Sequence, residues 1–187
     1  MQALMLFGRS TRLKDKPFIK IKGRKLFRHG YETLAGIFDK VLIVANESVA
    51  DKTGKLGVDY ITEDLGAGPA GAIVAGLKNL TSDYVFVAAC DMPFINDKVV
   101  RFMVDRVEGD GLFPRHENGD IEPLHGIYRR KPFIGVGIPE DRRVRTMIES
   151  LDVSYIPVEE LRMFDRGLLT FRNINTPEDI RWMETLS

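Results

Sequence analysis

The chain is poor in cysteine and histidine, the usual ligands of zinc. Its single cysteine, Cys90, cannot form a disulfide within the chain, and no CxxC pair is present. Of the three histidines, His29 and His116 are typical of surface or packing positions, and His125 has no second His or Cys at metal-binding spacing. These scarcities argue against a disulfide framework and a zinc centre, and they favour a reducing compartment.

The chain also lacks net charge and long apolar runs. Its 27 basic and 27 acidic side chains cancel, which leaves no global field to attract nucleic acid or anionic lipid. The N-terminal apolar run, residues 3–7, is much shorter than a membrane span or the core of a secretory signal. We therefore expect a cytoplasmic protein that binds neither nucleic acid nor membranes. Its 187 residues, 44% of them hydrophobic, suit one folded domain over residues 1–187.

Short runs rich in Val, Ile, Leu and Phe alternate with longer stretches of helical spacing. This order predicts an α/β fold with a mainly parallel sheet covered on both faces. The predicted strands are residues 2–7, 40–45, 59–63, 84–88, 111–115, 124–128, 154–157 and 170–172. The predicted helices are residues 26–37, 69–80, 96–108, 144–151 and 177–186, with Asn96 and Thr176 as caps. Residues 129–145, rich in Pro, Gly and basic side chains, predict an irregular connection.

The first candidate site is the passage LFGRSTRLKDKP at residues 6–17, directly after the first predicted strand. Gly8 would let the backbone turn close to a ligand, while Arg12 and a mobile Lys16 suit a polyphosphate. We interpret the basic run over residues 9–25 as this phosphate-binding loop. A solvated basic loop is the alternative, and the GxxxxGK[ST] spacing of a P-loop is absent.

The second candidate is the passage EDLGAGPAGA at residues 63–72, between a predicted strand and helix. Ligands of open α/β sheets bind beyond the carboxyl ends of the strands, where a helix N-terminus would point at the same crevice. Gly68 and Gly71 would permit close approach of a base or ribose. The alternative is a tight Gly-Pro turn, with Gly71 packing the helix on the strand.

The third candidate is Asp91, which follows the apolar run VFVAAC at residues 85–90. A carboxylate directly after a buried strand lies at the mouth of the crevice, where it can hold Mg²⁺ against a nucleotide phosphate. Turn formation before Pro93 is the alternative role. Cys90 is better explained as a small buried hydrophobe than as a nucleophile.

The fourth candidate is the pair Asn173 and Asn175, which flank Ile174 in the passage NINTPED. Alternation along an extended segment points both carboxamides to one side, where they could serve one phosphate or a metal-bound water. Helix entry alone is the alternative explanation.

The order and spacing of these passages resemble the molybdenum cofactor guanylyltransferase family. The resemblance covers nearly the whole chain and is strongest at GPAGAIVAGL (68–77), ACDMPFI (89–95), EPLHGIY (122–128) and NINTPED (173–179). It implies a three-layer Rossmann-like nucleotidyltransferase fold with a mainly parallel central sheet. The family opening LAGGxSxRMGxDK is replaced here by LFGRSTRLKDK, which lacks two glycines and is about two residues short. The region after Tyr128 is expected to lack a helix that relatives carry there.

The resemblance also assigns roles to individual residues. It implies catalytic roles for Arg12, Lys16 and Asp91, with Asp91 as the Mg²⁺ ligand. It implies nucleotide or acceptor contacts at the following positions: Leu6, Gly8, Ser10, Lys16, Asn46, Asp64, Gly68, Asn173 and Asn175.

The implied reaction is Mg²⁺-dependent transfer of GMP from GTP to molybdopterin, in which an acceptor phosphate oxygen attacks the α-phosphorus and pyrophosphate leaves. Three alternatives stay open: CTP as donor, another phosphorylated acceptor, or a nucleotide-binding protein with impaired catalysis. We expect a monomer or weak homo-oligomer whose partners are small-molecule substrates, with transient contacts to other cofactor-biosynthesis proteins.

Overall fold

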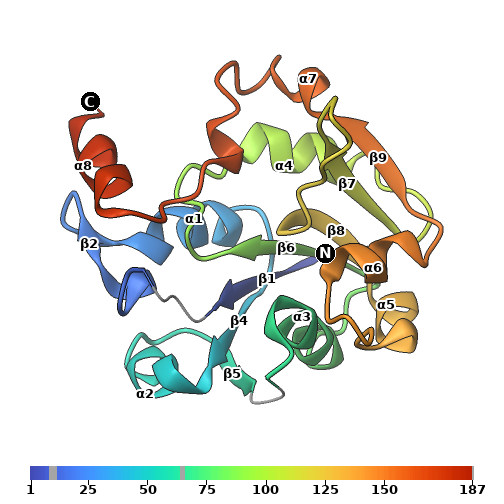
Figure 1. Cartoon of the computed structure of the whole chain (residues 1–187), viewed down its shortest axis with the longest axis horizontal. Coiled ribbons are helices and arrows are strands. Elements are labelled where there is room, and N and C mark those ends of the chain that lie inside the picture. The colour runs from blue at the N-terminus through green and yellow to red at the C-terminus, as the bar shows by residue number, and fades with distance from the viewer. Residues whose placement is uncertain (9–11, 64–65, 187) are drawn as a thin grey trace.

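Short apolar strands form the centre of the protein, whose computed structural model describes residues 1–8, 12–63 and 66–186. Within these ranges the main sheet has the strand order β5-β4-β1-β6-β8-β7-β9 (Figure 1). Its strands are β1 (Gln2–Phe7), β4 (Val41–Asn46), β5 (Tyr60–Glu63), β6 (Tyr84–Ala89), β7 (Gly111–Arg115), β8 (His125–Arg129) and β9 (Ser154–Pro157).

The sheet is mainly parallel, as the sequence predicts. Strands β5, β4, β1 and β6 are parallel neighbours, and β7 and β9 are also parallel. Strand β8 is antiparallel to both of its neighbours, β6 and β7. Leu6 near the end of β1 pairs with Val44 of β4 and with Ala89 of β6. The carboxyl ends of these central strands therefore meet at one edge.

Helices cover both faces of the sheet and give three layers. One face carries α1 (Leu26–Ala35), α4 (Asp97–Val104) and α7 (Val158–Leu161), and the other carries α3 (Gly68–Lys78), α5 (Arg130–Val136) and α6 (Val144–Glu149) (Figure 1). Along β1, Met5 joins the core under α1 and α4, while the next residue, Leu6, joins the core under α3. This period of two is what a strand buried on both faces requires. In the described part of the chain, no helix has the length and apolar character needed to cross a membrane.

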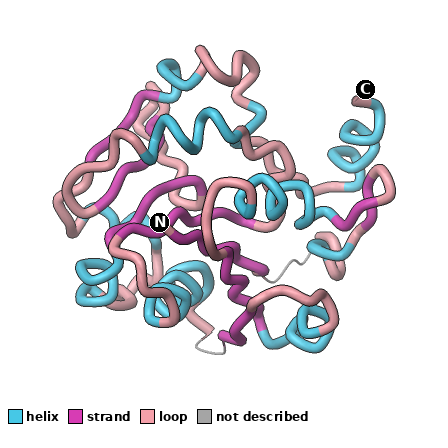
Figure 2. Tube along the Cα trace, turned by 180° about the vertical axis from the view of Figure 1, so that it is seen from behind, coloured by secondary structure: helices cyan, strands magenta, loops and turns pink. Residues whose placement is uncertain are grey.

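A third core joins a short hairpin in the N-terminal part of the chain to the C-terminal helix. The hairpin of β2 (Lys20–Ile21) and β3 (Arg24–Lys25) packs against α8 (Pro177–Thr185), and the helix and hairpin lie side by side in Figures 1 and 2. The buried residues between them are Ile21, Leu26, Ile174 and Met183. This packing brings the segment just before α8 next to the N-terminal part of the chain.

Most predicted elements are confirmed within a few residues, but residues 170–172 are not a strand. They belong largely to a 3₁₀-helix, η2 (Leu169–Phe171), which follows Leu168 in a left-handed conformation with φ 50°. The Thr170 amide donates to Asp165 Oδ2 at 2.7 Å, and the Thr170 hydroxyl accepts from the Asn96 amide at 3.1 Å. These side-chain contacts tie the segment to α4 rather than to a sheet edge.

The prediction for residues 129–145 is wrong over its first part, since α5 occupies Arg130–Val136. The expectation that a helix is missing there is wrong as well. Pro132 lies in the first turn of α5, where its missing N–H costs nothing, and Gly137 follows the helix with φ 70°. Residues that read as helix breakers therefore mark the helix boundaries. Helix α2 (Glu47–Gly54), which Asn46 caps, was not predicted from the sequence.

Candidate active site

A cavity of about 700 Å³ opens across the carboxyl ends of the central strands. The described site residues predicted from the sequence all line it: Leu6, Gly8, Arg12, Lys16, Asn46, Gly68, Asp91, Asn173 and Asn175. Ser10 and Asp64 lie outside the described residues. Segments far apart in the sequence thus supply one ligand-sized space.

Asp91 lies directly beyond the end of β6 and faces this cavity. Its Oδ2 atom accepts a short charged hydrogen bond from Lys16 Nζ. Its Oδ1 atom is buried and has no hydrogen-bond partner among the residues described. The side chain keeps 18% of its surface exposed, so the carboxylate is not sealed away from solvent. One oxygen is therefore left for a ligand.

Lys16 is held in place, contrary to the expectation of a mobile charge. It begins η1 (Lys16–Phe18), between Asp15 in a left-handed conformation and Pro17, and its side chain is only 8% exposed. Its Nζ group also donates to Asn175 Oδ1 at 2.6 Å. The ammonium is therefore oriented by two acceptors, because burial leaves water unable to compete for it.

Asn173 and Asn175 both line the cavity, as their alternation predicts, while Ile174 between them is fully buried. The Ile174 amide donates to the Asp91 carbonyl at 2.9 Å, which ties the two site segments together through the backbone. After them, Thr176 and Asp179 form a reciprocal capping box at the start of α8. The segment can therefore start α8 and also place both side-chain amides in the cavity, so the two interpretations do not exclude each other.

The glycines differ in what they contribute. A Cβ built on Gly8 or Gly68 would meet nothing within 4 Å, so both positions leave open space beside the cavity. Gly68 also has φ 60°, which side chains rarely adopt. Gly71 instead packs closely against other parts of the protein, because a Cβ there would lie 2.9 Å from both Glu63 Oε1 and Ala67 Cβ.

The basic run over residues 9–25 only partly serves the cavity. Arg12 and Lys16 line it, but the later cations belong to the hairpin. Arg24 pairs with Glu32 at 2.8 Å on the surface, and Lys22 Nζ donates to the Leu186 carbonyl. Lys22 and Gly23 have φ 50° and 77°, the pattern of a tight hairpin turn. The prediction of one phosphate-binding loop is therefore wrong for this second half.

Asn46 lies at the cavity wall, but its oxygen is engaged. Asn46 Oδ1 accepts from the Ser48 amide at 3.1 Å and from the Ser48 hydroxyl at 2.8 Å. Any contact with a ligand would therefore use the amide nitrogen of this side chain.

Sequence reasoning missed several residues of the cavity wall. Glu63, at the end of β5, is buried with only 6% exposure; it opens the candidate passage over residues 63–72, but no signal in the sequence indicated a role of its own. Glu122, Pro123 and Leu124 form another part of the wall. The His116 ring nitrogen Nε2 lies 2.8 Å from Glu122 Oε1, which positions that carboxylate. The motif EPLHGIY was a usable signal for this wall.

Cys90 and His125 are buried beside the site. Burial raises the pKa of the Cys90 thiol, which supports its interpretation as a small hydrophobe. Burial lowers the pKa of His125 to about 3, so this ring is neutral at physiological pH. It packs between Phe86 and Phe171, with ring centroids 5.1 and 5.0 Å away.

The described residues contain no cluster of three or more His, Cys, Asp or Glu that could hold a metal.

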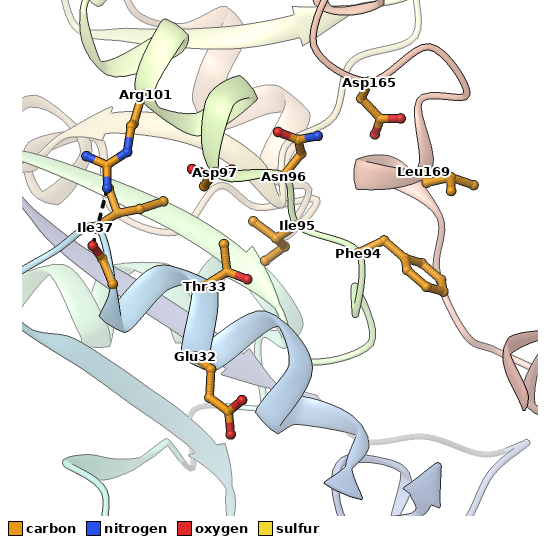
Figure 3. Close-up of a pocket in the computed structure, with 11 residues that line it drawn as sticks. Glu32, Thr33, Ile37, Phe94, Ile95, Asn96, Asp97, Arg101, Asp165 and Leu169 are labelled. Atoms are coloured by element: carbon orange, nitrogen blue, oxygen red, sulfur yellow. Dashed lines mark hydrogen bonds between the residues drawn. The ribbon is translucent and has the colours of Figure 1, made fainter. Parts of the chain in front are cut away.

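A second cavity of about 560 Å³ lies between α1, the start of α4 and the segment before η2 (Figure 3). None of the predicted site residues lines it. Its Arg101 side chain donates to the Gly36 carbonyl at 3.3 Å, and Asp165 accepts the Thr170 amide. These groups are already used within the fold, so the candidate site is the cavity that contains Asp91.

A mainly parallel three-layer fold with a cationic, carboxylate-bearing cavity at the strand ends is typical of Rossmann-like nucleotide-binding proteins. The family model described as the MobA-like NTP transferase domain matches residues 6–154. The chain belongs to this family of nucleotidyltransferases.

Two relatives illustrate the similarity. The molybdenum cofactor guanylyltransferase of Syntrophotalea carbinolica is 33% identical, and the alignment covers 94% of this chain and 86% of that protein. The crystal structure of molybdopterin-guanine dinucleotide biosynthesis protein A from Archaeoglobus fulgidus is 28% identical with a TM-score of 0.82, covering 98% of this chain and 97% of the other. The three-layer fold inferred from the sequence is thereby confirmed.

Proposed function

We propose that this chain transfers GMP from GTP to molybdopterin and releases pyrophosphate. The observation that carries the proposal is the cluster of Asp91, Lys16 and Asn175, assembled from three distant segments at the open edge of the sheet. The similarity to the molybdenum cofactor guanylyltransferase of Syntrophotalea carbinolica supports the choice of substrates.

The cavity is suited to positioning a nucleoside triphosphate. Arg12 and Lys16 supply positive charge, and the N-terminus of α3 begins at Gly68 on the same wall. Cations and the free amides of a helix N-terminus both favour phosphate oxygens. Asn173, exposed at the wall, supplies a neutral hydrogen-bonding group for the acceptor phosphate.

The proposed reaction forms one P–O bond and breaks another. An oxygen of the acceptor phosphate attacks the α-phosphorus of GTP, and pyrophosphate departs with the electron pair of the broken bond. The chain supplies orientation and charge neutralisation, because none of these residues is required as a nucleophile. Lys16, fixed by Asp91 and Asn175, offsets negative charge on the phosphates.

The residues present fit a magnesium ion. Mg²⁺ prefers oxygen ligands and is usually held by one or two carboxylates together with waters and substrate phosphates. The buried, unpartnered Oδ1 of Asp91 provides such a carboxylate oxygen at the cavity wall. We propose that Asp91 holds Mg²⁺, which when bound would neutralise charge on the phosphates.

The test is pyrophosphate release by the purified chain with Mg²⁺, using GTP, CTP, ATP and UTP in turn against molybdopterin and against sugar phosphates. We expect release with GTP and molybdopterin to exceed every other combination. A preference for CTP, or for a sugar phosphate, would reject the guanylyl assignment while keeping a nucleotidyltransferase. GTP binding without release on any acceptor would instead support a non-catalytic nucleotide-binding protein.

We propose a monomer or weak homo-oligomer that works in the cytoplasm and contacts other cofactor-biosynthesis proteins only transiently. Sedimentation velocity over a range of concentrations tests the first part, and a stable dimer at low concentration would contradict it.

A further inference from the structure

Glu63 has a buried carboxylate oxygen in the active-site wall for which the described residues provide no hydrogen-bond partner. Its residue surface is 6% exposed, and its Oε1 atom is buried without a hydrogen bond to the described residues. Among the described residues, Glu63 takes part in no ion pair. Burying an acceptor without a donor costs free energy, so such a group calls for a ligand or another explanation.

The surroundings of Glu63 differ from those of Asp91. Near Glu63 the wall contains Asn46, its partner in β4, together with Val44 of β4 and with Pro69 and Ala72 of α3. At the other end stand the charged and amide groups around Asp91. The part near Glu63, which combines apolar surface with a few polar groups, thus suits a planar base, and the charged part around Asp91 suits phosphates.

The spacing of the two ends fits a nucleotide. Strand β5, which ends at Glu63, is separated from β6 by β4 and β1. Three interstrand spacings amount to about 14 Å. A nucleoside with its phosphate chain can extend across such a distance, so a base beside Glu63 leaves its phosphates near Asp91.

The start of α3 leaves space for this carboxylate. Gly71 faces Glu63, and a Cβ there would lie 2.9 Å from Oε1. A larger residue at position 71 would push the carboxylate out of its place. The glycine thus keeps the acceptor at the cavity wall rather than permitting close approach of the ligand itself.

We propose that Glu63 determines base specificity by accepting hydrogen bonds from N1–H and the 2-amino group of guanine. An ionised carboxylate is an acceptor only, with two oxygens that match two adjacent donors. On the pairing edge, guanine presents two adjacent donors, whereas adenine and cytosine each present one donor and expose ring acceptors. Those acceptors would face the carboxylate, and a site with an unpaired buried polar group rejects such ligands.

This inference rests on the proposed use of GTP and deepens it. The first test needs no variant: the wild-type chain is titrated with GTP and with inosine triphosphate, which lacks the 2-amino group, and both dissociation constants are measured. A hydrogen bond to a charged group predicts that binding of inosine triphosphate is weaker by roughly 10- to 100-fold. Equal affinities would overturn the proposal.

The second test is Glu63→Gln with xanthosine triphosphate, which has a carbonyl oxygen at position 2. The glutamine amide can accept from N1–H and donate to that oxygen, so the preference between GTP and xanthosine triphosphate should reverse. Glu149→Gln makes the same chemical change at an exposed carboxylate paired with Arg145 on α6, and it should leave both affinities unchanged. Thermal unfolding checks that both variants are folded.

The outcomes separate this inference from the proposed function. If wild-type chain releases pyrophosphate from GTP but Glu63→Gln keeps the full preference for GTP over xanthosine triphosphate, the role of Glu63 is refuted and guanylyl transfer stands. If the wild-type chain prefers CTP in both binding and turnover, the guanylyl assignment and the role of Glu63 are both refuted.

Discussion

Replacement of Lys16 by methionine removes the cation that faces Asp91 while keeping an unbranched side chain of similar length. The two side chains are 8% and 18% exposed, so water can replace the lost ammonium only in part. Asn175 Oδ1 loses its donor at the same time. Breaking a buried pair costs about 3–5 kcal/mol, and the access of Asp91 to the cavity favours the lower end, about 3 kcal/mol. For a chain of this length, that corresponds to a fall in Tm of roughly 6–12 °C.

Urea unfolding of Lys16→Met, Asp91→Asn and the double variant measures how much of this cost comes from the pair. We expect the double variant to be destabilised by about 1–3 kcal/mol less than the sum of the single variants, because either change already breaks the same contact. The control is Lys52→Met, which breaks the exposed pair between Lys52 and Asp15 and should cost less than about 1 kcal/mol. Additive single effects, or a Lys16→Met variant as stable as the control, would refute the reasoning.

Three further predictions concern the groups that support the site. Burial lowers the pKa of His125 to about 3 in the folded chain, whereas the pKa of a histidine in the unfolded chain is near 6.5. As the pH falls, the unfolded chain therefore binds a proton at His125 before the folded chain does. The stability that neutral His125 contributes above pH 6.5 is therefore lost as the pH falls toward 3, and the loss amounts to about 3 kcal/mol at pH 4.5. Urea unfolding at pH 7 and at pH 4.5 measures this loss, which should be smaller in His125→Gln than in the wild-type chain. Thr170→Val deprives the N-cap amide of α4 of its acceptor, so we expect unfolding measurements to show a cost of about 1–3 kcal/mol. In Gly76→Ala the new methyl group would lie 2.3 Å from Leu4 Cδ1, so chemical denaturation should show a loss of about 1–3 kcal/mol in the free energy of unfolding. The control is Gly135→Ala, whose methyl group would meet nothing within 4 Å and which should show no loss.

The sequence predicts the central strands and the position of Asp91 at the sheet edge, because both follow from local signals. A carboxylate directly after a buried run reaches the sheet edge wherever that strand lies in the sheet, and the cavity does contain Asp91. The capping box at Thr176 is equally local, and it is confirmed. Continuous apolar runs and capping residues carry their structural consequence within a few positions.

The other features depend on contacts that no local pattern shows. Lys16 meets Asp91 and Asn175 across 75 and 159 positions of the chain, so its burial follows from the packing of α8 on the hairpin. Lys22 and Gly23 were a usable turn signal, but the surrounding charge favoured a phosphate-binding loop as the interpretation. Glu63 ends a strand like many surface residues, and only the fold reveals that its carboxylate is buried.

The most direct test of the proposed active centre is pyrophosphate release from GTP and molybdopterin by Asp91→Asn in the presence of Mg²⁺. Asparagine keeps the shape of the side chain but loses the charge, so the account predicts a fall in kcat of roughly 10²- to 10³-fold in a chain that remains folded. A folded Asp91→Asn chain with wild-type kcat would contradict the assignment of this cavity as the site of catalysis.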